Sequence, residues 1–179
     1  MQIIHEPESL VVPDNVRPEF FDGLFAHLPR VVTTTYEREG SHSWRGPDGK
    51  ASRSVSYWSS TNNEQPAFSE ARVLFGLSVN VNFDTVMVNR YSNPYVLPFH
   101  TDTNNVRSLA ILSLGASCEF FLRPFDPYVG PVTREPGPND YKVVCEHGDV
   151  VFLNARAQQF WMHGGIMPAN RYSIVWRQT

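Results

Sequence analysis

The pattern of apolar and polar residues changes near residue 85. Before that point, two segments carry apolar residues at helical spacing, and we expect helices over 18–28 and 66–80. Beyond it, short runs rich in Val, Ile, Phe and Tyr alternate with turn residues, a pattern typical of strands. The expected strands are 85–91, 95–99, 107–114, 117–123, 141–145, 149–153, 158–163 and 171–177.

The regular spacing of these short runs predicts a mainly β (α+β) fold, either a β-sandwich or a jelly roll. Pro98 has no amide hydrogen to give to a ladder, so we expect 95–99 at a sheet edge or a strand end. The Pro- and Gly-rich stretch 124–140 is long enough to be a flap beside a site, or equally a plain hairpin loop. With 179 residues, 41% of them hydrophobic, the chain has the size and apolar content of one domain.

Membrane and secretion signals are missing from the sequence. No stretch approaches the roughly 18 apolar residues that a membrane span needs, and the first twenty residues carry acids. We therefore expect no membrane partner and a protein that is not secreted but works in the cytoplasm, or the nucleus of a eukaryote. The two cysteines, Cys118 and Cys145, are expected to stay reduced in such a compartment.

The charge distribution shows no basic tract. Residues 1–84 hold seven Lys and Arg against eleven Asp and Glu, and residues 85–179 hold eight against seven, which gives −4 and +1 and the total of −3. A tight nucleic-acid binder normally shows a basic excess. Any contact with phosphates must therefore come from scattered arginines that the fold brings together.

His100 and Asp102 stand one residue apart behind an apolar run. In an extended segment their side chains point to the same side, so they can share a metal ion. A first-row metal that keeps positions open for reactants is commonly held by two His and one carboxylate. His163, ahead of the last strand-like run, can supply the second imidazole. A capped turn and a core histidine remain the alternatives.

The last run, "RYSIVWR", places two arginines on one face. Arg171 and Arg177 lie six residues apart and face the same way as Ser173 in a strand. Two guanidinium groups on one face are expensive to bury unless an anion lies between them. A dicarboxylate would satisfy both, because each planar fork binds a carboxylate with two hydrogen bonds. A pair of surface arginines on an edge strand is the alternative.

Four segments in this order resemble a known family: "VNRYSNPYVLPFHTDTN", "ILSLGASCEFFLR", "HGDVVFLNARAQQFWMHG" and "RYSIVWR". Together they look like the AlkB family of Fe(II)- and 2-oxoglutarate-dependent dioxygenases. The resemblance covers roughly residues 85–179. It implies a double-stranded β-helix, a jelly roll with N-terminal helices packed on one sheet. Residues 1–179 would then form a single domain, with helices and a substrate lid in 1–84 and the jelly-roll core in 85–179.

The resemblance also implies a role for each matching residue. His100, Asp102 and His163 would be the iron ligands and the catalytic centre. Arg171 would bind the distal carboxylate of 2-oxoglutarate with help from Asn89 and Tyr91. Arg177 would lie near the carboxylate beside the keto group. Ser173 stands where family members often carry Asn, and its shorter hydroxyl can still donate.

The activity implied is oxidative demethylation of alkylated bases in DNA or RNA, which releases formaldehyde, succinate and CO2. Fe(II) would be the cofactor, 2-oxoglutarate and O2 the co-substrates, and alkylated nucleic acid the partner, with the damaged base flipped into the pocket. One alternative keeps this chemistry in a hydroxylase of a small molecule or a protein side chain. Another is a non-catalytic jelly-roll binding module.

Departures from the family pattern concern the substrate. Asn104 stands where the family often has an acidic residue that helps to read the base, and the interval from His163 to Arg171 is short. Residues 1–84 match only loosely. Within them, Tyr57 and Trp58 can stack on a base and Arg53 can contact a phosphate. Core packing of the aromatics and a plain surface arginine are the alternatives.

Overall fold

The structure is a computed structural model of the chain. It describes residues 41–45, 51–58, 72, 73, 76, 80–102, 105–125 and 136–179, and within 41–58 it describes the side chains of Arg53 and Val55. The expected helix at 18–28 lies outside the described residues. Of the expected helix at 66–80, the described Arg72, Val73 and Gly76 are helical.

Antiparallel strands in two sheets make up most of the described chain. The six-stranded sheet has the order β1-β2-β3-β10-β5-β8, and the four-stranded sheet has the order β4-β9-β6-β7. The elements are β1 (Ser41–Arg45), β2 (Ala51–Trp58), β3 (Thr85–Tyr91), β4 (Tyr95–His100), β5 (Ser108–Gly115), β6 (Cys118–Pro124), β7 (Tyr141–Cys145), β8 (Val150–Leu153), α3 (Ala155–Phe160), β9 (Trp161–Met167) and β10 (Arg171–Gln178).

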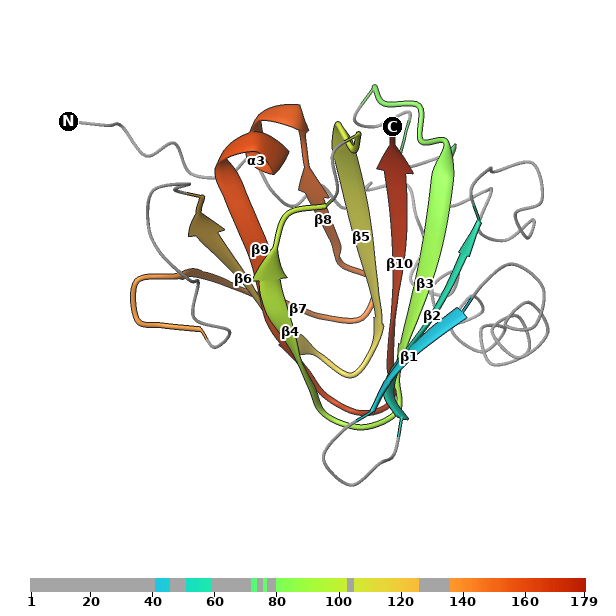
Figure 1. The fold of residues 1–179 in the computed structure, drawn as a ribbon, viewed down its shortest axis with the longest axis vertical. Helices are drawn as coiled ribbons and strands as arrows, with labels where there is room; N and C mark the ends of the chain where they lie inside the picture. Colours follow the sequence, from blue (N-terminus) through green and yellow to red (C-terminus); the bar gives the residue numbers. More distant parts are fainter. Residues whose placement is uncertain are drawn as a thin grey trace.

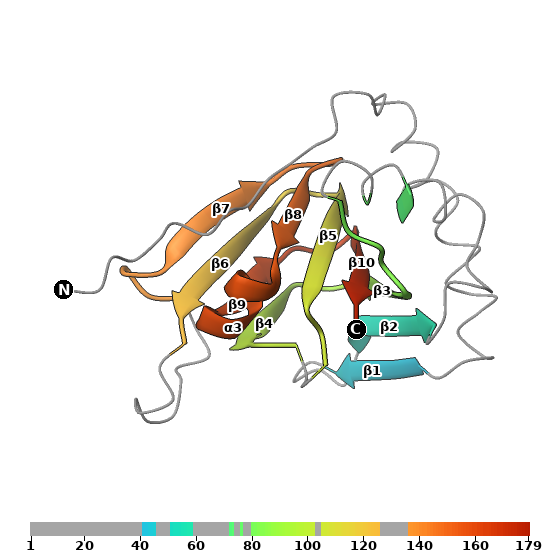
Figure 2. The same ribbon diagram turned by 90° about the horizontal axis from the view of Figure 1, so that it is seen from above.

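The two sheets face each other like the walls of a V (Figure 1). Seen from above, β6, β7 and β9 lie on one side and β1, β2 and β3 on the other (Figure 2). Between β3 and β10 the chain passes repeatedly from one sheet to the other, as in the short connections β3–β4, β5–β6, β7–β8 and β9–β10. This arrangement is the predicted jelly roll.

The tight turns depend on residues that accept positive φ. Gly115 and Gly148 have φ of 92°, and Asn170 has φ of 59°. They lie at the β5–β6, β7–β8 and β9–β10 connections. Glycine has no Cβ to clash in this region and asparagine tolerates it, so these residues let the chain pass sharply from one sheet to the other.

Strand β10 shows how the sequence pattern positions both the core and the site. Its even positions Ile174 and Trp176 are 0% and 1% exposed and lie on one face of the six-stranded sheet. Burial of each such side chain stabilises the fold by about 1.5–3 kcal/mol. Its odd positions Arg171, Ser173 and Val175 are also buried, Arg177 is half-buried, and all four point between the sheets. One face therefore holds the sheet in the core while the other presents polar groups to the interior.

Seven of the eight expected strands are confirmed within one residue at each end. The expected strand at 158–163 is wrong, because α3 occupies Ala155–Phe160 and β9 begins at Trp161. Asn154 caps the helix by accepting a hydrogen bond from the Ala157 amide at 2.9 Å. The predicted edge position of Pro98 is confirmed, since β4 is an edge strand with an irregular register near this residue.

Among the described residues, no helix has the length and apolar character that a bilayer crossing requires.

Candidate active site

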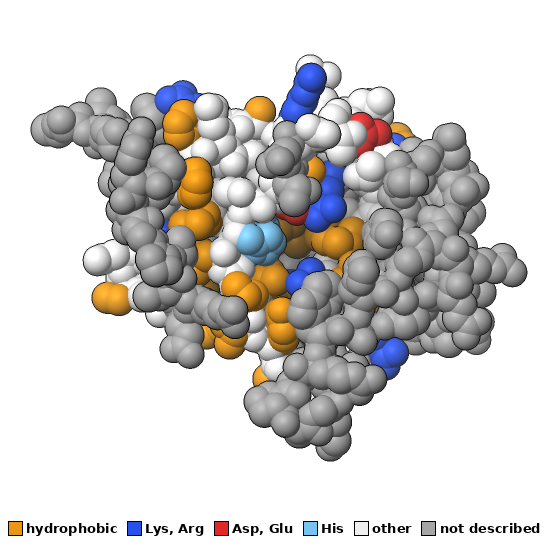
Figure 3. Space-filling model, in the orientation of Figure 1, with side chains coloured by type: hydrophobic (Ala, Val, Ile, Leu, Met, Phe, Trp, Pro, Cys, Tyr) orange, Lys and Arg blue, Asp and Glu red, His pale blue; other side chains and the backbone are white. Residues whose placement is uncertain are grey.

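A pocket lies between the two sheets, lined from both walls. The six-stranded sheet contributes every second residue of its strands, which are Met87, Asn89 and Tyr91 of β3, Ile111 and Ser113 of β5, and Arg171, Ser173, Val175 and Arg177 of β10. The hollow encloses about 480 Å³ of space, which includes its open mouth. Basic side chains, a histidine and hydrophobic side chains gather around it on the face shown in Figure 3.

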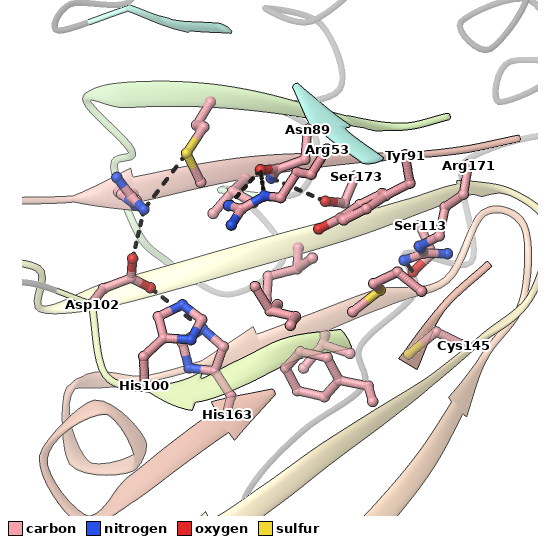
Figure 4. Close-up of a pocket in the computed structure, with 18 residues that line it drawn as sticks. Arg53, Asn89, Tyr91, His100, Asp102, Ser113, Cys145, His163, Arg171 and Ser173 are labelled. Atoms are coloured by element: carbon pink, nitrogen blue, oxygen red, sulfur yellow. Dashed lines mark hydrogen bonds and ion pairs between the residues drawn. The ribbon is translucent and has the colours of Figure 1, made fainter. Parts of the chain in front are cut away.

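His100, Asp102 and His163 meet at one end of this pocket (Figure 4). His100 ends β4 and is paired in register with His163 of β9, and their ring centroids are 4.3 Å apart. The Nε2 atom of His163 is 3.6 Å from Oδ2 of Asp102. Antiparallel pairing of β4 with β9 therefore joins residues that are more than sixty positions apart in the sequence.

The surroundings of the two imidazoles suit metal binding. Burial, followed by the neighbouring His100, lowers the pKa of His163 to about 3, so this ring is neutral at ordinary pH. The Nδ1 atom of His100 lies 2.7 Å from the Pro98 carbonyl oxygen, which can only accept. Nδ1 therefore donates to this carbonyl, and Nε2 is the ring nitrogen of His100 that can bind a metal.

The carboxylate of Asp102 faces the guanidinium of Arg177. Arg177 donates a hydrogen bond from Nη2 to Oδ1 of Asp102 at 2.5 Å. Among the described His, Cys, Asp and Glu residues, no three side chains form a ready-made cluster of metal ligands. The donor set of two imidazoles and one carboxylate nevertheless fits non-heme Fe(II).

A buried guanidinium lies at the other end of the pocket. Arg171 is 2% exposed and donates to Ser113 Oγ at 3.0 Å and to the Ala116 carbonyl at 3.2 Å. Its Nε atom is buried without a hydrogen-bond partner, and within the described part of the chain no carboxylate forms an ion pair with it. A buried cation without a counter-ion is costly, so this end is suited to an anionic ligand.

Polar groups of β2, β3 and β10 connect the two ends (Figure 4). Asn89 donates from Nδ2 to Ser173 Oγ at 3.1 Å and accepts from Arg53. Tyr91 is 2% exposed, and burial raises its pKa although the charges of Arg53 and Arg171 partly oppose the shift. Tyr91 is thus a neutral hydroxyl that can donate a hydrogen bond inside the pocket.

The two cysteines lie opposite each other on β6 and β7. Both are free and buried, as expected from the sequence, and Cys145 lines the pocket. A hydrogen bond to the Cys118 sulfur, together with burial, raises the pKa of the Cys145 thiol. Cys145 therefore adds a neutral thiol to the wall near Arg171.

Eight residues expected at the metal and co-substrate sites lie around this one pocket: His100, Asp102, His163, Asn89, Tyr91, Arg171, Ser173 and Arg177. Arg53, expected at a phosphate, also lines it. Tyr57 and Trp58 belong to β2, but their side chains and the whole of Asn104 lie outside the described residues.

Ser113 and Cys145 also line the pocket, and sequence reasoning did not place either of them there. Ser113 is a polar residue in the otherwise apolar run "LAILSL", and this was an available signal. Cys145 ends an amphipathic strand in which alternate residues are exposed, so its inward direction follows from the strand period.

The sequence model of the 2OG-Fe(II) oxygenase superfamily matches residues 24–172, most of the chain. The protein belongs to this superfamily. Fe(II) is the cofactor of this superfamily and 2-oxoglutarate its co-substrate, which confirms both predictions for this oxygenase.

Solved structures with the same fold include that of OsALKBH1, with a TM-score of 0.63 and 16% identity over 98% of this chain and 100% of the other. An oxidoreductase of the 2OG-Fe(II) oxygenase family from Burkholderia pseudomallei has a TM-score of 0.51 and 13% identity over 92% of this chain and 91% of the other. These comparisons support the sequence-based resemblance to AlkB proteins. None of the curated proteins matches the oxygenase in sequence.

Proposed function

We propose that this oxygenase is a dioxygenase that holds Fe(II) with His100, Asp102 and His163 and binds 2-oxoglutarate along the row of polar residues between Arg177 and Arg171. The observation that carries the proposal is the meeting, in one pocket, of two imidazoles, a carboxylate and a buried guanidinium without a carboxylate partner in the described chain. Metal ligands and a dicarboxylate site are the two requirements of this chemistry.

The polar residues fit the two ends of the co-substrate. Arg171 would bind the distal carboxylate through its planar fork, with further hydrogen bonds from Asn89 and Tyr91. Ser173 holds the Asn89 amide at 3.1 Å and so keeps that donor in the pocket. Arg177, beside Asp102, would lie near the keto acid that faces the metal.

The chain supplies positioning, electrostatics and exclusion of water. When bound, Fe(II) supplies the reduction of dioxygen that is coupled to decarboxylation of 2-oxoglutarate and oxidation of the primary substrate. His163 is 3% exposed and Asp102 has a side chain that is 8% exposed, so the metal end is shielded by both walls. This low-dielectric position strengthens the interactions of charged groups with the metal and the co-substrate.

We propose oxidative removal of methyl groups from alkylated bases of DNA or RNA as the reaction on the primary substrate. One methylated nitrogen, O2 and 2-oxoglutarate would give the demethylated base, formaldehyde, succinate and CO2. The proposal is supported by the AlkB-like motifs of residues 85–179 and by the fold shared with OsALKBH1. Tyr57, Trp58, Arg53 and Asn104 are the residues proposed to contact the nucleic acid.

A second candidate is the same chemistry on a small molecule or a protein side chain. It is favoured by the position of Arg53, whose guanidinium is hydrogen-bonded to Asn89 inside the pocket. The acidic excess of residues 1–84 also favours it. Both candidates need iron and 2-oxoglutarate, so they differ only in the acceptor of the oxygen atom.

A formaldehyde and succinate assay separates the candidates. Purified protein with Fe(II), ascorbate and 2-oxoglutarate is incubated with methylated DNA, methylated RNA, or methylated amines without a base. Formaldehyde released only from the nucleic acids supports demethylation of bases. Succinate without formaldehyde supports the hydroxylase. Failure to form succinate above a metal-free control with any acceptor would contradict the dioxygenase proposal.

A further inference from the structure

Arg53 occupies an unexpected place in the co-substrate region. It lies on β2, directly opposite Tyr91 in the register with β3, and its side chain lines the pocket. The guanidinium carbon is 5.8 Å from the centre of the Tyr95 ring, which gives it a cation–π contact in addition to its hydrogen bonds with Asn89. These contacts hold Arg53 in place and direct it inward.

The contact with Asn89 is made by two donors on one acceptor. Nε and Nη2 of Arg53 lie 3.0 Å and 2.8 Å from Oδ1 of Asn89. Asn89 is 2% exposed, and its Nδ2 donates to Ser173 Oγ at 3.1 Å. The three side chains thus form a continuous hydrogen-bonded chain across β2, β3 and β10.

These hydrogen bonds fix which end of the Asn89 amide faces the pocket. A guanidinium carries only donors, so the amide atom that faces Arg53 must be the oxygen. The amino group is then on the side of Ser173 and the pocket, where it can only donate. Without Arg53, either end of the amide could face a ligand, because the two ends have nearly the same shape.

A donor in this position suits an acceptor such as a carboxylate oxygen, and the charges around it favour an anion. Three arginines, Arg53, Arg171 and Arg177, line the same pocket. Arg171 satisfies part of its own hydrogen bonding with Ser113 and Ala116. Arg53 differs, because its guanidinium is hydrogen-bonded to the side chain of Asn89, which itself lines the pocket.

From this geometry we infer that Arg53 is a positioning residue for the co-substrate, which holds Asn89 as a donor to the distal carboxylate and so favours a dianionic 2-oxo acid over a monoanionic one. The inference rests on the proposed binding of 2-oxoglutarate in this pocket. It assigns to β2 a part in co-substrate selection, in addition to any contact that β2 makes with the primary substrate.

Equilibrium binding to the full chain loaded with Mn(II) tests the inference without turnover. The ligands are 2-oxoglutarate and 2-oxopentanoate, which has the same five carbons but a methyl group in place of the distal carboxylate. Arg53→Ala should weaken 2-oxoglutarate binding about five- to twentyfold, because Asn89 is no longer held as a donor and one hydrogen bond to a charged carboxylate is weakened or lost. It should change 2-oxopentanoate binding less than about twofold, within ordinary variation between surface variants.

Arg90→Ala is the matched control. Arg90 is exposed on β3, between Asn89 and Tyr91 in the sequence. Its replacement also removes one guanidinium, but from the opposite face of the sheet. Both ligands should bind to this variant as to the wild type. Arg53→Lys, which keeps the charge but loses the fork, should fall between wild type and Arg53→Ala, and it serves if the alanine variant does not fold.

A double-mutant cycle with Asn89→Ala separates positioning from direct contact. If Arg53 acts through Asn89, then Arg53→Ala should have little further effect on 2-oxoglutarate binding in the Asn89→Ala background. Additive losses, equal losses for the two ligands, or unchanged 2-oxoglutarate affinity in both Arg53 variants would overturn the inference while the wild type still binds. A wild-type protein that does not bind 2-oxoglutarate would overturn the proposed function itself, and this inference with it.

Discussion

Arg177 of β10 and Asp102, two residues after β4, form a hydrogen-bonded ion pair at 2.5 Å at the metal end of the pocket. The pair joins the two sheets at the end where the imidazoles lie. It also occupies one oxygen of the carboxylate that we assign to the metal. The other oxygen, Oδ2, faces His163 and is available to the metal. The positive charge of Arg177 opposes the binding of a metal cation beside it, while it favours the binding of an anionic co-substrate.

Replacement of Arg177 by Met should separate these two effects. Without the guanidinium, Mn(II) should bind a few-fold more tightly in the absence of 2-oxoglutarate, because a partly exposed ion pair is worth about 0.2–1 kcal/mol. The KM for 2-oxoglutarate should rise about tenfold, since a charged hydrogen bond is lost. Metal titration and succinate kinetics measure the two constants. A parallel loss of both affinities would instead indicate a collapsed site.

The proposed metal ligands can be tested by loss of binding. His163→Ala and Asp102→Ala should abolish stoichiometric iron binding, because two remaining ligands hold the metal much less well. Iron content after anaerobic loading and desalting measures this. Glu119→Ala is the control for the loss of a carboxylate, since Glu119 of β6 has a side chain that is 40% exposed and pairs with Lys142 away from the pocket. Full iron content in the Asp102 variant would show that Asp102 is not an iron ligand.

The distal end of the co-substrate site depends on the shape of Arg171. Arg171→Lys should weaken 2-oxoglutarate binding about tenfold or more, because an ammonium keeps the charge but cannot form the two-pronged contact. The lysine ammonium also lacks the planar fork with which Arg171 donates to Ser113 and to the Ala116 carbonyl. Calorimetric titration with 2-oxoglutarate gives the affinity, and unfolding temperature shows whether the variant stays folded. An affinity equal to that of the wild type would assign the distal carboxylate to another residue.

Much of this arrangement is readable from the sequence because β-strands have a period of two. The alternation in "RYSIVWR" alone is enough to place Arg171, Ser173 and Arg177 on one face, and His100 and Asp102 follow the same rule. Long-range register is not readable in this way. The contact of Arg53 with Asn89 depends on how β2 pairs with β3, and these residues are 36 positions apart.

The missed helix α3 has a local cause. The helix ends with the residues "AQQF", and the apolar start of β9 follows directly. The periodicity of apolar residues therefore does not show where the helix ends and the strand begins. The N-cap Asn154 was the available signal, because its side chain satisfies an amide of the first turn. The residues that contact the primary substrate cannot be predicted in this way. Recognition of a base depends on contacts between separate segments, and the period of a strand does not specify these contacts.

Asp140 should make the stability of the fold dependent on pH below about 4. It accepts hydrogen bonds from Arg123 Nε at 2.6 Å, from Arg123 Nη2 at 2.5 Å and from the Gly137 amide at 2.6 Å. The contact with Arg123, followed by the Gly137 amide, lowers its pKa, and burial only partly opposes this. The native state thus favours the ionised carboxylate more than the unfolded chain does, in which the pKa is about 3.9.

The sign of the effect follows from linkage. A carboxyl whose pKa is lower in the native state contributes stability above about pH 4, and this contribution disappears as the pH falls through the native pKa. Asp140→Asn should therefore cost about 1–2 kcal/mol of unfolding free energy at neutral pH, and the difference from the wild type should shrink at more acidic pH. Urea unfolding at several pH values measures it. Glu119→Gln, which breaks an exposed pair with Lys142, should cost about 0–1 kcal/mol throughout. A cost for Asp140→Asn that stays constant down to the lowest pH would show that the ionised pair contributes nothing to stability.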